Sequence, residues 1–284
     1  FFFDSDKLFR LSFFSLKFHS NGLHLRAINK RKNTMGQSSI FNHRSIRKYL
    51  PNNVDDALLN RILEAGIRAS NTGNMQVYSI VVTRDQHLRE QLWEAHFKQD
   101  MVKQAPVHLT FCVDINRFSH WCVINNASPG YDNFLWFLNG AIDAVLASQN
   151  ISIEAENNGL GICYLGTAAY NADKIIEILK LPRGVIPVTA IVMGYPAETP
   201  ELTDRLPLEA VVHFDTYQNY SDSIIRELYS AIENSDFAKR LIAENQVANF
   251  ATIFTEKRYK KTDNQFFSQK YLKILEQQGF MNNF

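Results

Sequence analysis

A long apolar segment at residues 134–158 places the strongest constraint on how this chain folds. Its apolar side chains follow helical spacing but lie on more than one face, and a helix of that kind has to be covered by a core or by another subunit. Asp143, Glu154 and Glu156 interrupt the run, so the segment does not qualify as a membrane span. We therefore expect a buried helix whose apolar residues include Leu138, Ile142, Val145, Leu146, Ile151 and Ile153.

Shorter helical and extended patterns surround this segment. Apolar residues at helical spacing predict helices over residues 54–68, 86–97 and 171–181, and Gly159-Leu160-Gly161 stops the long helix. Strands are predicted over residues 77–83, 107–114, 162–165 and 188–194. Because helices and strands alternate irregularly, with too few uniform β-α-β units for a barrel, we expect an α/β or α+β fold with one large core.

The chain changes character after residue 216. Polar helical patterns follow over residues 223–234, 236–254 and 264–279. A tail with so little apolar surface of its own commonly packs around a partner subunit. We therefore divide the chain into a core at residues 35–216 and a C-terminal helical extension at residues 217–284 that embraces the partner of a homodimer.

Residues 1–34 differ from the rest of the chain. They carry seven Lys or Arg against Asp4 and Asp6, and they hold seven phenylalanines without a helical or alternating period. Met35, the first methionine, directly precedes the first organised segment. Two interpretations stay open, a leader that is not part of the native fold or a targeting segment, and neither contributes to the predicted fold.

The overall composition is that of an ordinary globular protein. With 45% hydrophobic and 21% charged residues, the chain is neither disordered nor collagen-like. Thirty basic and 29 acidic side chains leave a net charge of +1, so nothing in the balance indicates a nucleic-acid or membrane surface. Cys112, Cys122 and Cys163 form no C-x-x-C motif, which disfavours a disulfide framework or a cysteine zinc site. A reducing, cytoplasmic compartment fits this usage.

Several common catalytic motifs do not occur in residues 1–284. The chain has no G-x-x-x-x-G-K-S/T, H-E-x-x-H or G-x-S-x-G motif, which excludes the usual P-loop, zinc-protease and serine-hydrolase sites. Gly159 and Gly161 end a helix and open a strand, the reverse of a dinucleotide-binding loop, so a helix C-cap and a cofactor contact stay open as equal alternatives for them. His87, His96 and His108 are interpreted as solvated or hydrogen-bonded side chains, and no metal site is expected.

The segment His43-Arg44-Ser45-Ile46-Arg47 concentrates two guanidinium groups and a hydroxyl just before the first expected helix. Forked Arg donors and a Ser hydroxyl match the oxygens of a phosphate group, which carries about −1.5 to −2 charges. A solvated basic turn explains the same residues equally well. The segment alone leaves both interpretations open.

Five motifs in order make the chain resemble the FMN-dependent nitroreductases over about residues 40–284. They are HRSIR at 43–47, SNTGNMQ at 70–76, EAENNGLGICYLG at 154–166, GYPAE at 194–198 and RLP at 205–207. Asn150, the TPEL segment at 199–202 and QGF at 278–280 make it most similar to the oxygen-insensitive NADPH nitroreductase and flavin reductase branch. The resemblance implies an α+β nitroreductase fold, with a central mixed, mostly antiparallel sheet flanked by helices, and non-covalent FMN at a homodimer interface.

The resemblance also assigns roles to individual residues. It implies that His43, Arg44, Ser45 and Arg205 hold the phosphate and ribityl end of FMN. Arg47 would approach the pyrimidine edge, where a cation favours the reduced flavin. Asn71 would reach the cofactor of the other subunit, Gln99 would hydrogen-bond the pyrimidine, and the backbone of Tyr164, Leu165 and Gly166 would pass the reactive side of the ring. For Gly166, only glycine permits so close an approach.

The same resemblance places a nicotinamide cofactor near a basic cluster in the C-terminal extension. The cluster consists of Lys257, Arg258, Lys260 and Lys261. Its charge would act on the 2′-phosphate that distinguishes NADPH from NADH. A solvated basic loop is the alternative, and the preference between NADPH and NADH stays open.

The implied activity is NAD(P)H-dependent reduction of nitroaromatics, quinones or free flavin by a ping-pong mechanism. NAD(P)H delivers its electrons and leaves, and a small-molecule acceptor then takes them in the same pocket. The sequence does not identify a catalytic acid or base, and the resemblance places the chemistry on the flavin. One departure is Thr203-Asp204-Arg205, where the branch usually has Lys-x-Arg. Two alternatives stay open: a dedicated free-flavin reductase, and a protein of the same fold that binds or delivers FMN with little or no turnover.

Overall fold

A four-stranded sheet organises residues 39–282, the part of the chain that this computed structural model describes. Its strands are β1 (Tyr78–Thr83), β2 (Val107–Asp114), β3 (Gly161–Leu165) and β4 (Val185–Gly194), in the spatial order β1-β2-β4-β3. All three neighbouring pairs are antiparallel, and Ser45 adds a parallel bridge to Ile162 at the β3 edge. The expected α+β fold with a mostly antiparallel sheet is confirmed, but its four described strands pair without any parallel neighbours, so the sheet itself is not mixed. The leader predicted at residues 1–34 lies outside the described residues.

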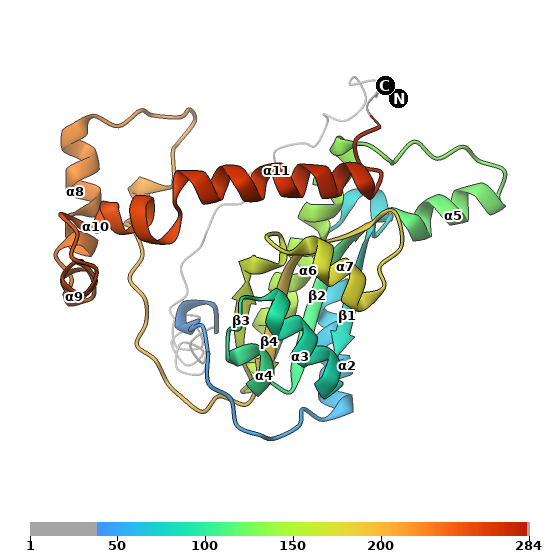
Figure 1. Cartoon of the computed structure of the whole chain (residues 1–284), viewed down its shortest axis with the longest axis horizontal. Helices are drawn as coiled ribbons and strands as arrows, with labels where there is room; N and C mark the ends of the chain where they lie inside the picture. The colour runs from blue at the N-terminus through green and yellow to red at the C-terminus, as the bar shows by residue number, and fades with distance from the viewer. Residues whose placement is uncertain (1–38, 283–284) are drawn as a thin grey trace, which may run out of the picture. The chain divides into compact units, whose positions relative to one another are not determined.

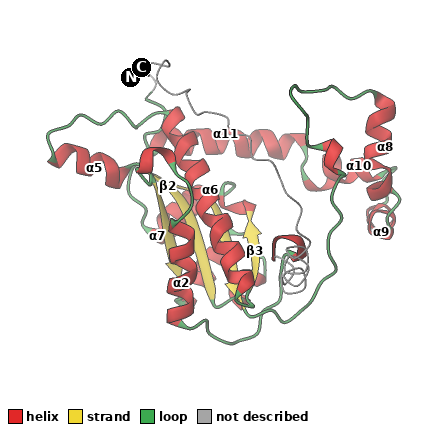
Figure 2. Cartoon of the chain, turned by 180° about the vertical axis from the view of Figure 1, so that it is seen from behind, coloured by secondary structure: helices red, strands yellow, loops and turns green. Residues whose placement is uncertain are grey.

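Helices cover both faces of the sheet (Figure 1, Figure 2). On one face α2 (Asp56–Ile67) and α6 (Phe134–Asn157) pack against Leu109 and Phe111 of β2. On the other face α3 (Gln86–Ala95), α4 (Met101–Gln104) and α7 (Ala172–Leu179) pack against Ala190 and Val192 of β4. Because β2 is an interior strand covered on both sides, every one of its residues is buried.

The long helix α6 is apolar on two faces, as predicted. The Asn133 side chain caps its start by accepting from the Trp136 amide, and Gly159, with φ 78°, follows its end. One face packs into the core through Ala144, Ala147, Ile151 and Ala155. The other face leaves Leu138, Ile142, Val145 and Leu146 exposed in this chain. Residues 39–282 therefore cover one of the two apolar faces of α6 and leave the other exposed.

Some elements of the core differ from the prediction. β4 begins at Val185, on the far side of Pro187, although proline usually marks the end of a strand. A bulge accommodates it: Phe111 pairs with Thr189 while Cys112 pairs with Pro187, which leaves Val188 unpaired. In addition, α5 (Asn116–Ile124) has no counterpart among the predicted helices.

The C-terminal region contains α8 (Asp222–Glu233), α9 (Asp236–Asn245), α10 (Phe250–Thr252), the π-helical turn η6 (Ile253–Arg258) and α11 (Lys261–Gln277). The prediction of one helix over residues 236–254 is wrong. α9 ends where Gln246 adopts φ 53°, and Asn249 caps a new helix. At the end of the chain Ile274, Leu275 and Phe280 join the core cluster that contains Val113 and Ile186.

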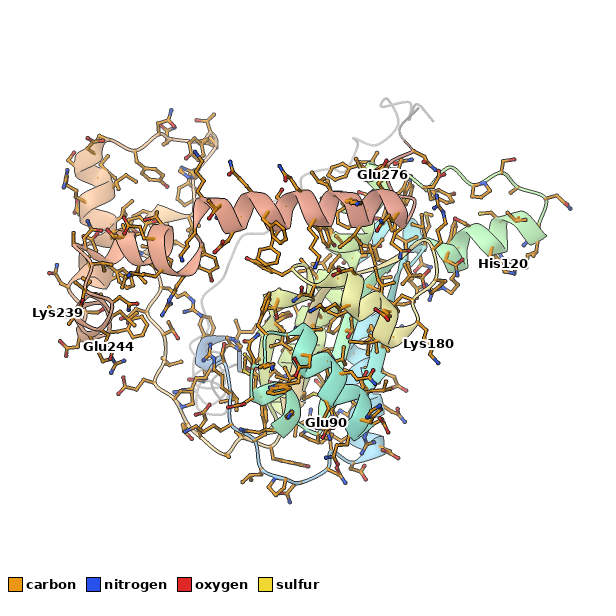
Figure 3. The ribbon with its side chains drawn as sticks, viewed as in Figure 1. Glu90, His120, Lys180, Lys239, Glu244 and Glu276 are labelled. Carbon is orange, nitrogen blue, oxygen red and sulfur yellow. The ribbon has the colours of Figure 1, made fainter. Side chains whose placement is uncertain are left out.

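Charged side chains lie on the outside of the helix layers. Glu90 of α3, Lys180 at the end of α7 and Glu276 of α11 are exposed and point outward (Figure 3). Within residues 39–282 no helix has the length and apolar character needed to cross a bilayer. Cys112, Cys122 and Cys163 are all buried and free.

Candidate functional site

The basic segment at residues 43–47 runs along the outer edge of β3. Ser45 bridges to Ile162, and the Ile46 amide donates to the Ile162 carbonyl at 2.9 Å. Gly161 makes this approach possible, because a Cβ there would lie 2.5 Å from Cγ1 of Ile46. Ile46 is buried and anchors the segment to the sheet, while Arg47 beside it is exposed.

Two glutamates hold the ends of this segment. Nδ1 of His43 lies 2.6 Å from Oε1 of Glu156 in α6. Oε1 of Glu198 accepts from the amides of Arg47 and Lys48 at 2.7 and 3.1 Å. Burial raises the pKa of the Glu156 carboxyl, and its hydrogen bond with His43 offsets part of that effect. The two carboxylates thereby fix the path of the basic segment.

The donors of this segment fit a phosphate group. The buried Nε of Arg44 has no hydrogen-bond partner among residues 39–282, although NH1 donates to the Asn42 carbonyl at 3.0 Å. A buried guanidinium nitrogen without an acceptor is destabilising, and an anionic oxygen is the acceptor that suits it best. The half-buried Ser45 adds a hydroxyl, and Arg47 adds a second guanidinium.

β3 leads from this segment to Gly166. The Tyr164 hydroxyl lies 2.8 Å from Oγ of Ser148 and accepts from Oγ of Ser152 at 3.3 Å, which fixes the strand on α6. Leu165 is buried, whereas Gly166 is exposed and a Cβ there would meet no atom within 4 Å. The space beside Gly166 is therefore open to the close approach of a planar ligand.

Gln99 lies beside the same turn. Its Nε2 donates to the His96 carbonyl at 3.0 Å and to Oγ1 of Thr167 at 3.3 Å. Thr167 directly follows Gly166, so the structure brings Gln99 together with the end of β3. Of the three histidines in question, His87 is exposed, whereas His96 and His108 are buried and hydrogen-bonded to each other. No group of three or more potential metal ligands occurs in the described residues.

The Asn71 loop is held in an unusual backbone conformation. Gly73, Asn74 and Gln76 have φ between 53° and 57°. The buried carboxylate of Asp143 in α6 accepts from the Thr72 amide at 3.0 Å and from its hydroxyl at 3.2 Å. Asn71 itself accepts from the Gln76 amide. The loop is thus preformed, and the Asn71 side chain is hydrogen-bonded to the backbone of Ala69 and Gln76.

Arg205 and the basic cluster at 257–261 are not joined to these groups within the described chain. NH1 of Arg205 donates to the carbonyls of Thr203 and Asp204, so its hydrogen bonds stay in its own exposed loop. Lys257 and Arg258 end η6, and Lys260 and Lys261 begin α11. All four side chains of the cluster are exposed.

The prediction missed several residues that shape this site. Glu156 and Glu198 stood inside recognised motifs, but nothing in the sequence paired them with His43 or with the amides of Arg47 and Lys48. Thr167 follows the last motif glycine, and its position there was the available signal. The contact between His96 and His108 had no sequence signal, because the two histidines are 12 positions apart and no motif links them.

Comparison with known proteins places this geometry among relatives. The model of the Nitroreductase family matches residues 40–195. The oxygen-insensitive NADPH nitroreductase of Salmonella typhimurium is 36% identical over 183 residues, which cover 64% of this chain and 75% of that protein. The FMN reductase (NADPH) of Bacillus subtilis is 33% identical over 186 residues, which cover 65% of this chain and 75% of that protein.

Solved structures match a larger part of the chain. A protein from Bacteroides fragilis superposes with a TM-score of 0.85 at 48% identity and covers 86% of this chain and 99% of its own. The NADPH:FMN oxidoreductase of Vibrio harveyi, in complex with NAD+, superposes with a TM-score of 0.68 at 28% identity, over 86% of this chain and 98% of that one.

Proposed function

The chain belongs to the nitroreductase family, and we propose that it is an FMN-dependent NAD(P)H oxidoreductase that reduces nitro compounds or free flavins. The observation that carries the proposal is the donor set at the edge of β3. Arg44, Ser45 and Arg47 lie beside the start of β3, where Ser45 bridges to Ile162. The open space beside Gly166 lies at the other end of β3. The names of the Salmonella nitroreductase and the Bacillus FMN reductase support the same activity.

We assign the phosphate end of FMN to His43, Arg44 and Ser45. The unpartnered Nε of Arg44 supplies a directed donor, and Ser45 supplies a hydroxyl. Because Glu156 engages Nδ1 of His43, Nε2 is the ring nitrogen left to a ligand. We also assign Arg205 to the phosphate. It lies in the loop that precedes the C-terminal region.

When bound, FMN supplies the hydride and electron chemistry, and the protein supplies binding, orientation and charge. Arg47 contributes a cation near the ring. Gln99 contributes hydrogen bonding to the pyrimidine edge, and the backbone of residues 164–166 positions the ring beside Gly166. No side chain is assigned as an acid or base.

We infer that two copies of the chain form a homodimer through the outer face of α6. Leu138, Ile142, Val145 and Leu146 are between 42% and 49% exposed on that face. A row of apolar side chains on one helix is the usual core of a homodimer interface. In this assembly Asn71 reaches the cofactor of the other subunit, and the extension at residues 217–284 embraces the partner. The cytoplasmic location stays a prediction.

The first experiment is an absorption spectrum of the purified protein, followed by anaerobic addition of NADPH. We expect flavin absorption that NADPH bleaches and that a nitroaromatic restores. Arg44→Ala should release FMN about 10- to 150-fold more readily, because one charge-assisted phosphate contact is lost. Bound flavin that NADPH does not bleach would indicate a delivery protein instead, and equal FMN affinity in Arg44→Ala would remove the phosphate assignment.

The assembly is tested by sedimentation of Ile142→Glu. A carboxylate on the outer face of α6 should dissociate the dimer and release FMN together. Glu90→Lys is the control, because this exposed residue lies on α3, in the helix layer on the other side of the sheet (Figure 3). A wild-type monomer of about 33 kDa that retains FMN would contradict the shared site.

A further inference from the structure

A line of polar contacts runs from the sheet interior to Gln99. Nε2 of His108 in β2 lies 3.2 Å from Nε2 of His96, and Nδ1 of His96 lies 2.7 Å from Oγ1 of Thr167. Thr167 in turn accepts from Nε2 of Gln99. At the inner end, Oγ1 of Thr110 lies 3.4 Å from Nδ1 of His108. His96, His108 and Thr110 are each 0% exposed, so the line is closed at its inner end.

Both imidazoles of this line are neutral. Burial lowers the pKa of His96 to about 4, and burial lowers that of His108 well below its ordinary value, with His96 and Arg89 acting in the same direction. Each ring therefore carries a single N–H, and one hydrogen occupies each contact of the line. Because Thr110 is buried, the line offers no route for protons to bulk water, and its role is to fix orientation.

The orientation of the Gln99 amide follows from its partners. A backbone carbonyl only accepts, so the nitrogen of the amide has to face the His96 carbonyl at 3.0 Å. The same nitrogen donates to Thr167. Among the described residues none donates to Oε1 of Gln99. The group that Gln99 offers to a ligand is consequently an acceptor, the amide oxygen.

An acceptor at this position discriminates between ligand edges. The pyrimidine edge of a flavin carries an imide N–H between two carbonyl oxygens, and only the N–H can pair with an amide oxygen. If the Gln99 amide were reversed, its nitrogen would pair with a carbonyl instead. The His96 carbonyl and the Thr167 hydroxyl, the two groups that hold the amide nitrogen, therefore decide which flavin atom is recognised.

We propose that the buried His96–His108 pair is a positioning device that holds Thr167 and, through it, fixes the Gln99 amide oxygen as the acceptor for the imide N–H of the bound flavin. This inference rests on the proposed function, because it takes Gln99 as part of the FMN site. It adds three positioning residues, His96, His108 and Thr167, to those assigned above.

The test compares the binding of FMN and of 3-methyl-FMN, which lacks the imide N–H. Dissociation constants are measured by flavin fluorescence on the cofactor-free protein. The wild type should bind FMN at least about fivefold more tightly than the methylated analogue, the size of one hydrogen bond. In Thr167→Val and His108→Leu this preference should fall below about twofold, as it should in Gln99→Leu.

Rescue and matched controls separate positioning from a general loss of structure. Thr167→Ser keeps the hydroxyl and should restore the preference. His87→Gln changes an exposed histidine of α3 and should leave it unchanged. Thr167→Val is nearly isosteric and half-buried, so it tests the inference even if His108→Leu does not fold.

The outcomes distinguish this inference from the proposed function. Wild-type protein that binds neither flavin overturns the FMN site and this inference with it. Wild-type protein that binds FMN with a clear preference, together with Thr167→Val and His108→Leu variants that keep that preference, overturns the positioning role alone. Equal wild-type affinity for the two flavins also overturns it.

Discussion

Oε1 of Glu156 lies 2.6 Å from Nδ1 of His43, and this contact ties the last turn of α6 to the first residue of the basic segment. The carboxylate orients the imidazole and leaves Nε2 as the ring nitrogen that faces a ligand. Glu198 acts on the other end of the segment through backbone amides. The segment is thus held by two acidic residues, although its proposed ligand is itself an anion.

Replacing Glu156 by Gln should weaken FMN binding about three- to tenfold, because the charge-assisted contact that orients His43 is lost. Glu154→Gln is the matched control. Glu154 lies two residues earlier on α6, is similarly shielded and pairs with Arg61 at 2.8 Å. Fluorescence titration measures the FMN affinity of both variants. Equal affinities in the two variants would show that the His43 contact does not serve the site.

Gly161→Ala should destabilise the protein by about 1–3 kcal/mol, the usual effect of overpacking. The added methyl group would lie 2.5 Å from Cγ1 and 2.8 Å from Cβ of Ile46, and it would push the basic segment away from β3. Urea unfolding of the cofactor-free protein measures the change. A stability equal to that of the wild type would mean that the segment yields without loss of packing.

Gly166→Ala should behave in the opposite way. The new Cβ meets no atom within 4 Å, so the stability of the cofactor-free protein should change by less than about 0.5 kcal/mol. FMN affinity should fall, because the methyl group occupies the space that we assign to the ring. Urea unfolding and FMN titration of the same preparation test both halves. Unchanged affinity would place the ring elsewhere.

Asp143→Asn should alter how stability depends on pH. Burial raises the pKa of Asp143, and hydrogen bonds from Thr72 offset only part of that effect. The folded state therefore holds this proton to higher pH than the unfolded chain, and wild-type stability falls as pH rises from the ordinary carboxyl pKa through the raised one. Relative to the wild type, the D143N variant should gain stability across that window. Urea unfolding between pH 4 and 8 measures the difference, and parallel curves would contradict it.

Arg258→Ala should raise the KM for NADPH about tenfold or more and leave that for NADH nearly unchanged, because a forked guanidinium on the 2′-phosphate is removed. Lys239→Ala is the control, since this exposed lysine of α9 lies outside the basic cluster (Figure 3). Steady-state kinetics with both nucleotides provide the measurement. An equal rise in KM for the two nucleotides, or no rise for either, would show that the basic cluster is a solvated loop that does not recognise the 2′-phosphate.

Sequence patterns anticipated the elements whose signals are local. The strand over 107–114 has the predicted bounds, and α6 differs from its prediction by its final residue. The helix expected over 236–254 failed because the left-handed turn at Gln246 carries no glycine, the residue that usually marks such a turn. The strand predicted over 188–194 was too short, because the bulge that lets β4 continue through Pro187 depends on pairing with β2.

The candidate site shows the same difference between local sequence signals and contacts that depend on the fold. Arg44, Ser45 and Arg47 could be proposed from the sequence because phosphate chemistry favours particular residue types at short spacing, and the family resemblance added His43. The pairing of His43 with Glu156 spans 113 positions, and only the packing of α6 beside β3 brings the two together. The contact between His96 and His108 likewise depends on the fold, because α3, which ends just before His96, has to pack on the face of the sheet that carries His108. Residue types can be matched along the chain, whereas their partners are set by the fold.

The bridge between Ser45 and Ile162 has a consequence for how the protein behaves in solution. β3 is an edge strand, and the basic segment is the part of the chain that shields its free amide and carbonyl groups. An uncovered edge recruits strands from other molecules and promotes aggregation. The residues that we assign to the cofactor therefore also protect the sheet against self-association, and variants that detach the segment should precipitate as well as lose FMN.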